Sequence, residues 1–186
     1  MRVKRPILVA NNIALKLSII FFLLLSSSCL FAQYGEPPVE RPYSYTLVDG
    51  GKLASNSDLS AYIATVKKGS TNSQTFLRIG WIYSLNGQAI ATNVQRGTIY
   101  LTKAEAQALL EKLSALHKIS MLEKPEVVTM HRDKVNEDLL VGLNHVPGNP
   151  VFLLLINRLG EWTQHEIKTD EVANCLQTLK RAIAQM

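Results

Sequence analysis

Two runs of strand-like sequence, each followed by a helix, constrain the fold of this chain more than any other feature. Apolar side chains at helical spacing predict helices over residues 103–118 and 171–185. The segments rich in β-branched and aromatic residues that precede them are 43–48, 61–66, 75–85, 98–101, 139–146, 151–156 and 162–167. Strands grouped before helices are typical of an α+β domain. We therefore expect an α+β fold in which a mainly antiparallel sheet carries both amphipathic helices on one face.

Residues around the predicted elements supply the turn and capping signals. Thr102 and Glu105 have the spacing of a capping box, in which two free amide groups at the start of a helix are each bonded by a side chain. Thr169 or Asp170 is expected to cap the second helix. The pair Asn86–Gly87 predicts a hairpin turn leading into a further strand over 88–91.

The two helices align with each other, which raises the hypothesis of a degenerate duplication of a strand-strand-helix unit. Placing Leu101 on Ile167 also places Glu105 on Glu171 and Leu113 on Leu179. The alternative is that any two amphipathic helices that follow strands align equally well. Sequence alone leaves both interpretations open.

The first 32 residues have the features of a secretory signal peptide. Basic residues at the start are followed by the apolar run 17–25 and then by three serines. The run is shorter than the roughly 20 apolar residues of a membrane-spanning helix. Cleavage after Ala32 would leave Gln33 as the first residue of a periplasmic or extracellular protein. In the alternative interpretation Cys29 is lipidated and anchors the protein to a membrane surface, as in a bacterial lipoprotein.

Removing the leader changes how the rest of the composition is interpreted. The chain has 20 Lys and Arg against 15 Asp and Glu, and four of the basic residues lie in the leader, so the mature part is nearly neutral. A nearly neutral chain without a clustered basic face is not expected to bind nucleic acid. Residues 33–43, with three prolines, predict an extended linker, and residues 44–186 are expected to form a single domain.

The triplet His131-Arg132-Asp133 resembles the catalytic loop of protein kinases but lacks its other parts. The kinase pattern requires Asn five residues after the Asp, and this chain has Asp138 there. We therefore expect a polar loop with local ion pairs between the two halves of the chain. His131 and Asp133 are nevertheless retained as weak catalytic candidates, because functional sites are common on loops.

The remaining reactive or aromatic residues also lack a complete motif. His165-Glu166 matches half of a zinc-protease helix, but Thr169 stands where the second His should be, so His165 is another weak candidate. Neither a metal site nor a cofactor site is predicted. Cys175 is expected on a buried helix face. Trp81 and Trp162, with Tyr83, are expected in the core rather than in a sugar-stacking platform.

These observations favour an exported, non-catalytic module that binds an unknown protein or small ligand in the cell envelope. Whether the protein is an enzyme stays open at this stage. One alternative is a hydrolase-type enzyme whose site is assembled from residues distant in sequence. Another is an inhibitor or immunity-type protein. An exposed apolar patch or a free sheet edge would favour binding, whereas a cleft with adjacent titratable groups would favour the enzyme.

Overall fold

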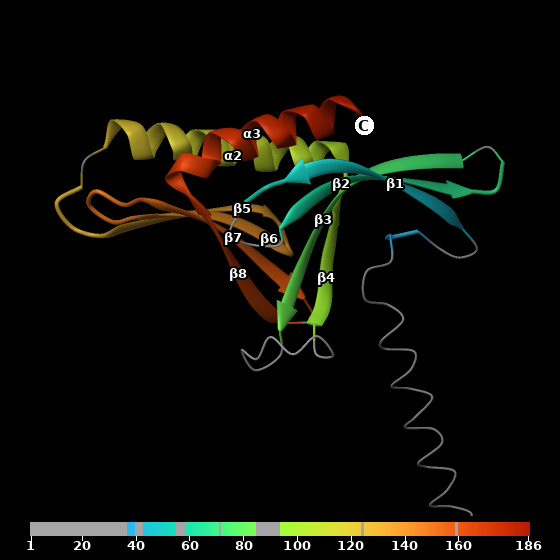
Figure 1. The fold of residues 1–186 in the computed structure, drawn as a ribbon, viewed down its shortest axis with the longest axis horizontal. Helices are drawn as coiled ribbons and strands as arrows, with labels where there is room; N and C mark the ends of the chain where they lie inside the picture. Colours follow the sequence, from blue (N-terminus) through green and yellow to red (C-terminus); the bar gives the residue numbers. More distant parts are fainter. Residues whose placement is uncertain are drawn as a thin grey trace, which may run out of the picture. The chain divides into compact units, whose positions relative to one another are not determined.

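A computed structural model describes residues 37–39, 43–54, 59–70, 72–84, 94–123, 125–158 and 160–186. Residues Pro37–Met186 form one compact unit in which four strands and then a helix occur twice along the chain (Figure 1). The elements of the first half are β1 (Ser44–Lys52), β2 (Ser60–Lys68), β3 (Asn72–Ser84), β4 (Val94–Leu101) and α2 (Lys103–Leu122). Those of the second half are β5 (Thr129–Asn136), β6 (Leu139–His145), β7 (Val151–Arg158), β8 (Glu161–Lys168) and α3 (Thr169–Ala184).

The strands form two sheets, and all neighbouring strands are antiparallel. Sheet A has the order β1-β2-β3-β4, and sheet B has the order β5-β6-β7-β8. The fold is thus α+β, but the expectation of one sheet is wrong. In each half, strands that follow one another in sequence also pair with one another, so each run of four strands completes its own meander. The 20-residue helix α2 separates the two meanders.

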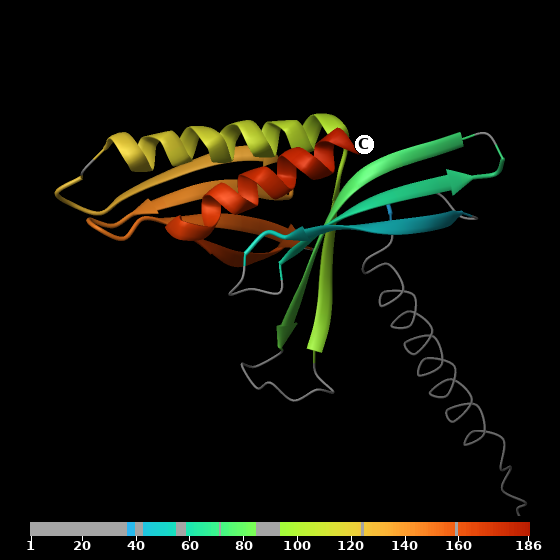
Figure 2. The same cartoon turned by 45° about the horizontal axis from the view of Figure 1, so that its top comes forward.

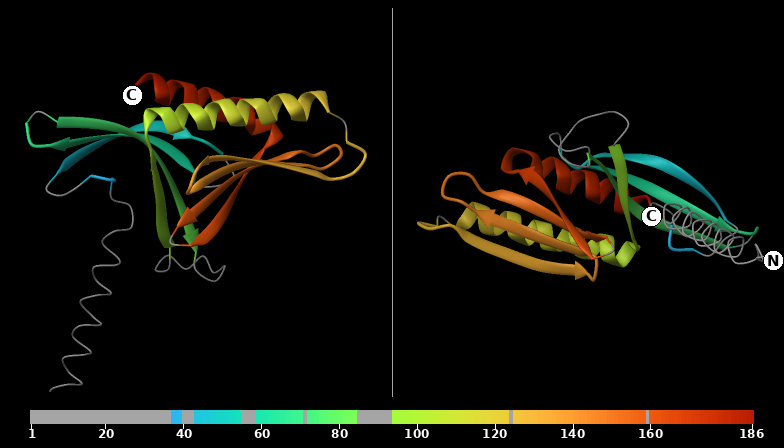
Figure 3. Two further views of the ribbon diagram at one scale, coloured as in Figure 1. Left: turned by 180° about the vertical axis from the view of Figure 1, so that it is seen from behind. Right: turned by 90° about the horizontal axis from the view of Figure 1, so that it is seen from below.

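Both helices pack across the two sheets, so neither lies on one face of a single sheet. Helix α2 contacts β3 and β4 of sheet A and β5 and β6 of sheet B, and α3 contacts β1, β2, β7 and β8. The helices also contact each other, and Figures 2 and 3 show them side by side. One core cluster contains Leu77 and Trp81 from sheet A, Phe152 from sheet B, Leu109 from α2 and Leu179 from α3. This shared core joins the two halves.

The start of α2 confirms the predicted capping box, whereas the prediction for α3 is wrong. The Glu105 amide donates to Thr102 Oγ1 at 3.3 Å, and the Thr102 amide donates to Glu105 Oε2 at 2.8 Å. The N-cap of α3 is Lys168, whose side chain makes no capping bond. Thr169 is already helical, and its hydroxyl donates instead to the carbonyl of Pro150. The Thr169 hydroxyl therefore bonds to a residue distant in sequence instead of capping the helix.

The segment predicted as a polar loop between the two halves is partly the strand β5. Its charged residues hid a strand signal, because only Met130 and Val135 are apolar within 129–136. The predicted Asn86–Gly87 hairpin and the strand over 88–91 lie outside the described residues. None of the helices in the described ranges is both long and apolar enough to span a membrane.

Sheet A has a second apolar layer on the face that points away from the common core. Ala64, Val66 and Phe76 are buried there and form a separate small cluster. Val39 and Tyr43 pack against it, so the described part of the predicted linker contacts the sheet. This face carries most of the aromatic side chains considered below.

Candidate functional site

Three strands of sheet A place an arginine between two tyrosines on the outer face. In the strand register, Tyr62 of β2 lies opposite Arg78 of β3, and Arg78 lies opposite Tyr100 of β4. Side chains directly opposite one another in a sheet point to the same face and are close enough to touch. We call these three residues the Tyr–Arg–Tyr row. The strand pairing itself, rather than a loop, fixes their order.

The guanidinium of Arg78 is held by both tyrosines. It lies over the ring of Tyr62 at 5.2 Å from the ring centroid, within the range of a cation–π interaction. It is also hydrogen-bonded to the Tyr100 side chain. Burial raises the pKa of Tyr100, and the charge and hydrogen bond of Arg78 oppose that rise. Tyr100 therefore stays protonated at neutral pH.

A glycine next to the row lets the arginine lie against the sheet. A Cβ atom built on Gly80 would be 3.2 Å from Arg78 Nη1 and 3.7 Å from the Tyr62 ring. A larger residue at this position would push the guanidinium outward. Gly inside a strand commonly marks such a close approach, and this was a signal that the sequence offered.

Further aromatic and apolar side chains extend the row into a surface. The rings of Phe76 and Tyr100 meet edge-on with their centroids 6.2 Å apart, and the ring centroids of Tyr43 and Tyr45 are 6.1 Å apart. Tyr45 and Leu47 of β1 are 46% and 42% exposed. We use the name aromatic face for this side of sheet A, with the members Tyr43, Tyr45, Leu47, Tyr62, Phe76, Arg78 and Tyr100.

The aromatic face contains none of the residues of the platform considered from sequence, Trp81, Trp162 and Tyr83. Trp81 and Trp162 lie apart, one in the core and one on the surface. Trp81 is 2% exposed in the common core, as expected, whereas Trp162 is 48% exposed on β8 and is not a core residue. The side chain of Tyr83 lies outside the described residues. The tyrosines of the aromatic face come from three parts of the chain, β1 with the residue before it, β2 and β4, so only the strand register brings them together.

The catalytic candidates His131 and Asp133 lie on the edge strand β5, near charged side chains of α2 and its C-cap residue. His131 Nε2 is 3.8 Å from Glu123 Oε2, and Asp133 Oδ1 is 4.0 Å from Lys112 Nζ. A third contact comes from Asn136, whose Nδ2 donates to Glu105 Oε1 at 2.8 Å. These distances place the two side chains near α2 and Glu123, the residue that follows it, and the structure records no contact between His131 and Asp133 themselves.

His165, the third catalytic candidate, lies where the two sheets meet. Its ring packs against Trp81 with the centroids 5.1 Å apart, and the guanidinium of Arg158 lies 5.6 Å from the Trp81 ring. Burial lowers the pKa of His165 to about 4, so the side chain is neutral at physiological pH. Within the described ranges, neither Trp81 Nε1 nor His165 Nε2 has a hydrogen-bond partner.

Cys175 is buried on α3, which confirms the prediction for this residue. Burial, together with the charge of Glu171, raises the pKa of its thiol to about 12. A thiol with so high a pKa is almost entirely protonated at neutral pH, and it is the thiolate that reacts as a nucleophile. Cys175 therefore behaves as a small core side chain.

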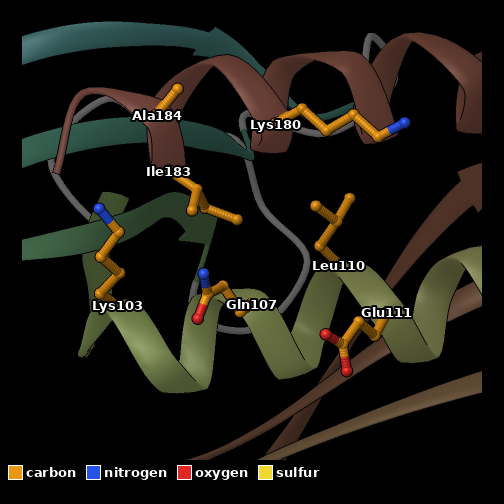
Figure 4. A pocket seen from close by; sticks show the side chains of 7 residues that line it. All are labelled: Lys103, Gln107, Leu110, Glu111, Lys180, Ile183 and Ala184. Carbon is orange, nitrogen blue, oxygen red and sulfur yellow. The ribbon is translucent and has the colours of Figure 1, made fainter.

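A shallow groove of about 370 Å³ runs between the two helices (Figure 4). Leu110 and Ile183 lie on its two sides, and the titratable groups lining it are Lys103, Glu111 and Lys180. In the parts of the chain that the structure describes, no group of three His, Cys, Asp or Glu side chains could hold a metal ion.

Comparisons with known proteins leave the chain without a family. No protein-family model and no curated protein matches it. Among solved structures, a chain from the crystal structures of trypanosoma bruciei MRP1/MRP2 superposes with a TM-score of 0.35 and 10% sequence identity. The match covers 99% of this chain and 96% of the other. A likeness at that TM-score carries no argument about function.

Proposed function

We propose that this protein is an exported, non-catalytic binding module that recognises another protein through the aromatic face of sheet A. The observation that carries the proposal is the Tyr–Arg–Tyr row, in which Tyr62 and Tyr100 hold the guanidinium of Arg78. Tyr and Arg are among the residues that contribute most to protein–protein binding energy. A side chain already fixed before binding loses less entropy when the partner arrives.

The surroundings of the row favour a protein partner over other ligands. The face is a sheet surface with exposed Tyr45 and Leu47 at its β1 edge, which suits a broad contact. A small ligand would instead favour a concave pocket. A nucleic acid would favour clustered basic residues, but the part of the chain after the leader is nearly neutral.

The positions of the three catalytic candidates, His131, Asp133 and His165, are compatible with a non-catalytic binding module. His131 and Asp133 contact α2, and His165 packs against Trp81. Each of these contacts has a structural explanation. An inhibitor or immunity-type role is a special case of the binding module, in which the bound partner is an enzyme.

Site-specific crosslinking in the native cell tests the proposed surface. A photo-reactive phenylalanine analogue at Tyr62 is expected to give an adduct with one partner protein. The Arg78→Ala substitution in the same chain should abolish the adduct, and Arg78→Lys should weaken it because Lys keeps the charge but not the planar stack. The matched control places the analogue at Gln164, an exposed position on β8 of the other sheet. Equal adducts from both positions, or an adduct that survives Arg78→Ala, would contradict the proposal.

Export is proposed from the leader alone, since residues 1–36 lie outside the described part of the chain. The expected mature protein begins at Gln33 and is periplasmic or extracellular. N-terminal sequencing and mass spectrometry of the protein from the cell envelope distinguish this form from one lipidated at Cys29. A cytoplasmic protein that retains Met1 would contradict export.

We also propose that the two halves of the chain arose by duplication. Helices α2 and α3 begin at Lys103 and Thr169, which is the offset of the alignment of Leu101 with Ile167. Each helix follows a four-stranded antiparallel meander. The unit expected from the sequence was strand-strand-helix, and because each helix follows four strands, the repeated unit that we propose is ββββα.

A further inference from the structure

The strand β1 is an edge strand whose first half is exposed on both faces. It has one strand neighbour in the described part of the chain, β2, with which Ser44 to Asp49 pair in regular register. All six residues of this segment are exposed, including Tyr45, Leu47 and Val48. An edge strand presents unpaired N–H and C=O groups that a further strand can bind.

The chemistry of this segment differs from that of the two edge strands of sheet B. Strand β5 carries Arg132, Asp133 and Lys134 in succession, and charges on an edge strand oppose pairing with another chain. Strand β8 likewise carries Glu161, Glu166 and Lys168. From Ser44 to Val48, β1 has no charged residue. The edge of β1 therefore lacks the protection present on β5 and β8.

A break in β1 sets the length available for pairing. The register with β2 shifts between Asp49 and Gly51, and the Gly51 amide donates to Asp49 Oδ1 at 2.8 Å. Gly51 has a φ of 104°, a conformation that glycine adopts without strain. The regular uncharged part is thus Ser44–Val48, and its central residue is Thr46.

We propose that Ser44–Val48 pairs antiparallel with the same segment of a second copy of this chain, about a two-fold axis at Thr46. An isologous contact requires each residue to be compatible with its symmetry mate. Here Thr46 lies opposite Thr46, and Tyr45 lies opposite Leu47 on both sides of the axis. Aromatic–aliphatic and Thr–Thr neighbours stabilise cross-strand pairs.

Strand β5 does not satisfy the same requirement. An axis at Arg132 places two arginines opposite each other, and an axis at Asp133 pairs Asp133 with itself and Arg132 with Lys134. Like charges directly opposite one another destabilise a sheet.

Pairing through β1 joins two copies of sheet A into one eight-stranded sheet, in which the two aromatic faces become continuous. The dimer shares Tyr45 and Leu47 with the aromatic face but leaves the Tyr–Arg–Tyr row uncovered, so Thr46→Lys tests the dimer and Arg78→Ala tests the proposed partner separately.

The oligomeric state of the full chain tests the dimer. Five paired residues make a small interface, so sedimentation equilibrium should show a dimer that dissociates in the micromolar range, and the concentration series should reach about 100 μM. Thr46→Lys, which places two lysines together at the axis, should weaken dimerisation at least about tenfold. Met130→Lys on β5 is the matched control and should leave it unchanged. A protein that stays monomeric throughout the series, or a dimer insensitive to Thr46→Lys, would overturn the proposal.

Crosslinking tests the position of the axis. Directly opposed residues of an antiparallel pair have Cα atoms about 4.5–5.5 Å apart, which suits a disulfide. In a chain carrying Cys29→Ser, Thr46→Cys should form an intermolecular disulfide on mild oxidation. Val48→Cys should not, because its partner across the axis is Ser44. Efficient crosslinking through Val48→Cys alone would reject the axis at Thr46. Buried Cys175 does not compete.

Discussion

The packing of Trp81 against Gly97 gives the sharpest test of the core. A Cβ atom built on Gly97 would lie 2.1 Å from Trp81 Cε2 and 2.5 Å from Nε1. Ordinary contacts begin near 3.4 Å, so Gly97→Ala forces a displacement of more than 1 Å. The ring is 2% exposed and cannot move into solvent without leaving the core. Overpacking of this kind lowers the free energy of unfolding by about 1–3 kcal/mol. Because the overlap is severe, we expect Gly97→Ala to lie at the upper end of this range, at about 3 kcal/mol.

A double-mutant cycle separates this overlap from effects on the backbone. Trp81→Leu removes the ring atoms that the new methyl group would meet. In that background Gly97→Ala should be neutral or stabilise by about 0.5–1 kcal/mol, because Ala is favoured over Gly inside a strand. Urea unfolding of the four proteins measures the coupling between the two substitutions, which should be about 3–4 kcal/mol.

The control for the cycle is Gly80→Ala on the opposite face of sheet A. Its Cβ would be 3.2 Å from Arg78 Nη1, the flexible end of a side chain, so the cost should be below about 1 kcal/mol. If Gly97→Ala unfolded at the wild-type urea concentration, or lost equal stability with and without the Trp81 ring, the packing described here would be refuted.

Three further predictions concern the helix cap, the buried histidine and the cysteine. Thr102→Ala should lower the free energy of unfolding by about 1 kcal/mol in urea titrations, and Thr102→Ser should restore it. The pKa of His165 in the folded protein, about 4, lies below its ordinary value of 6.5. The stability contributed by the neutral His165 side chain is therefore fully present above pH 6.5 and is lost as the pH falls toward 4. Allowing for partial exposure, wild type should lose about 2 kcal/mol over that range relative to His165→Gln, and parallel pH curves would contradict this. Cys175 should react with a thiol reagent only in denaturant, and fast labelling of the native protein would contradict its burial.

Local signals were sufficient for much of the secondary structure. The start of α2 followed from Thr102 and Glu105, because a capping box involves residues three positions apart. The run Val151–Ile156 became the largely buried strand β7, because a short continuous apolar run is typical of a buried strand. Strand β5 did not follow from the sequence because only Met130 and Val135 in it are apolar. Its link to α2, the hydrogen bond from Asn136 to Glu105, joins residues 31 positions apart and leaves no local pattern.

The sequence by itself determined the α+β composition, the positions of both helices and the burial of Cys175, since each depends on periodicity within one segment. Tertiary structure alone decided that the strands divide into two sheets and that both helices cross them. It also decided the candidate site. Tyr62, Arg78 and Tyr100 come from three strands, and they become neighbours only through the register of β2, β3 and β4. A shift of one residue in either pairing would move a tyrosine to the opposite face, and no local pattern in the sequence specifies that register.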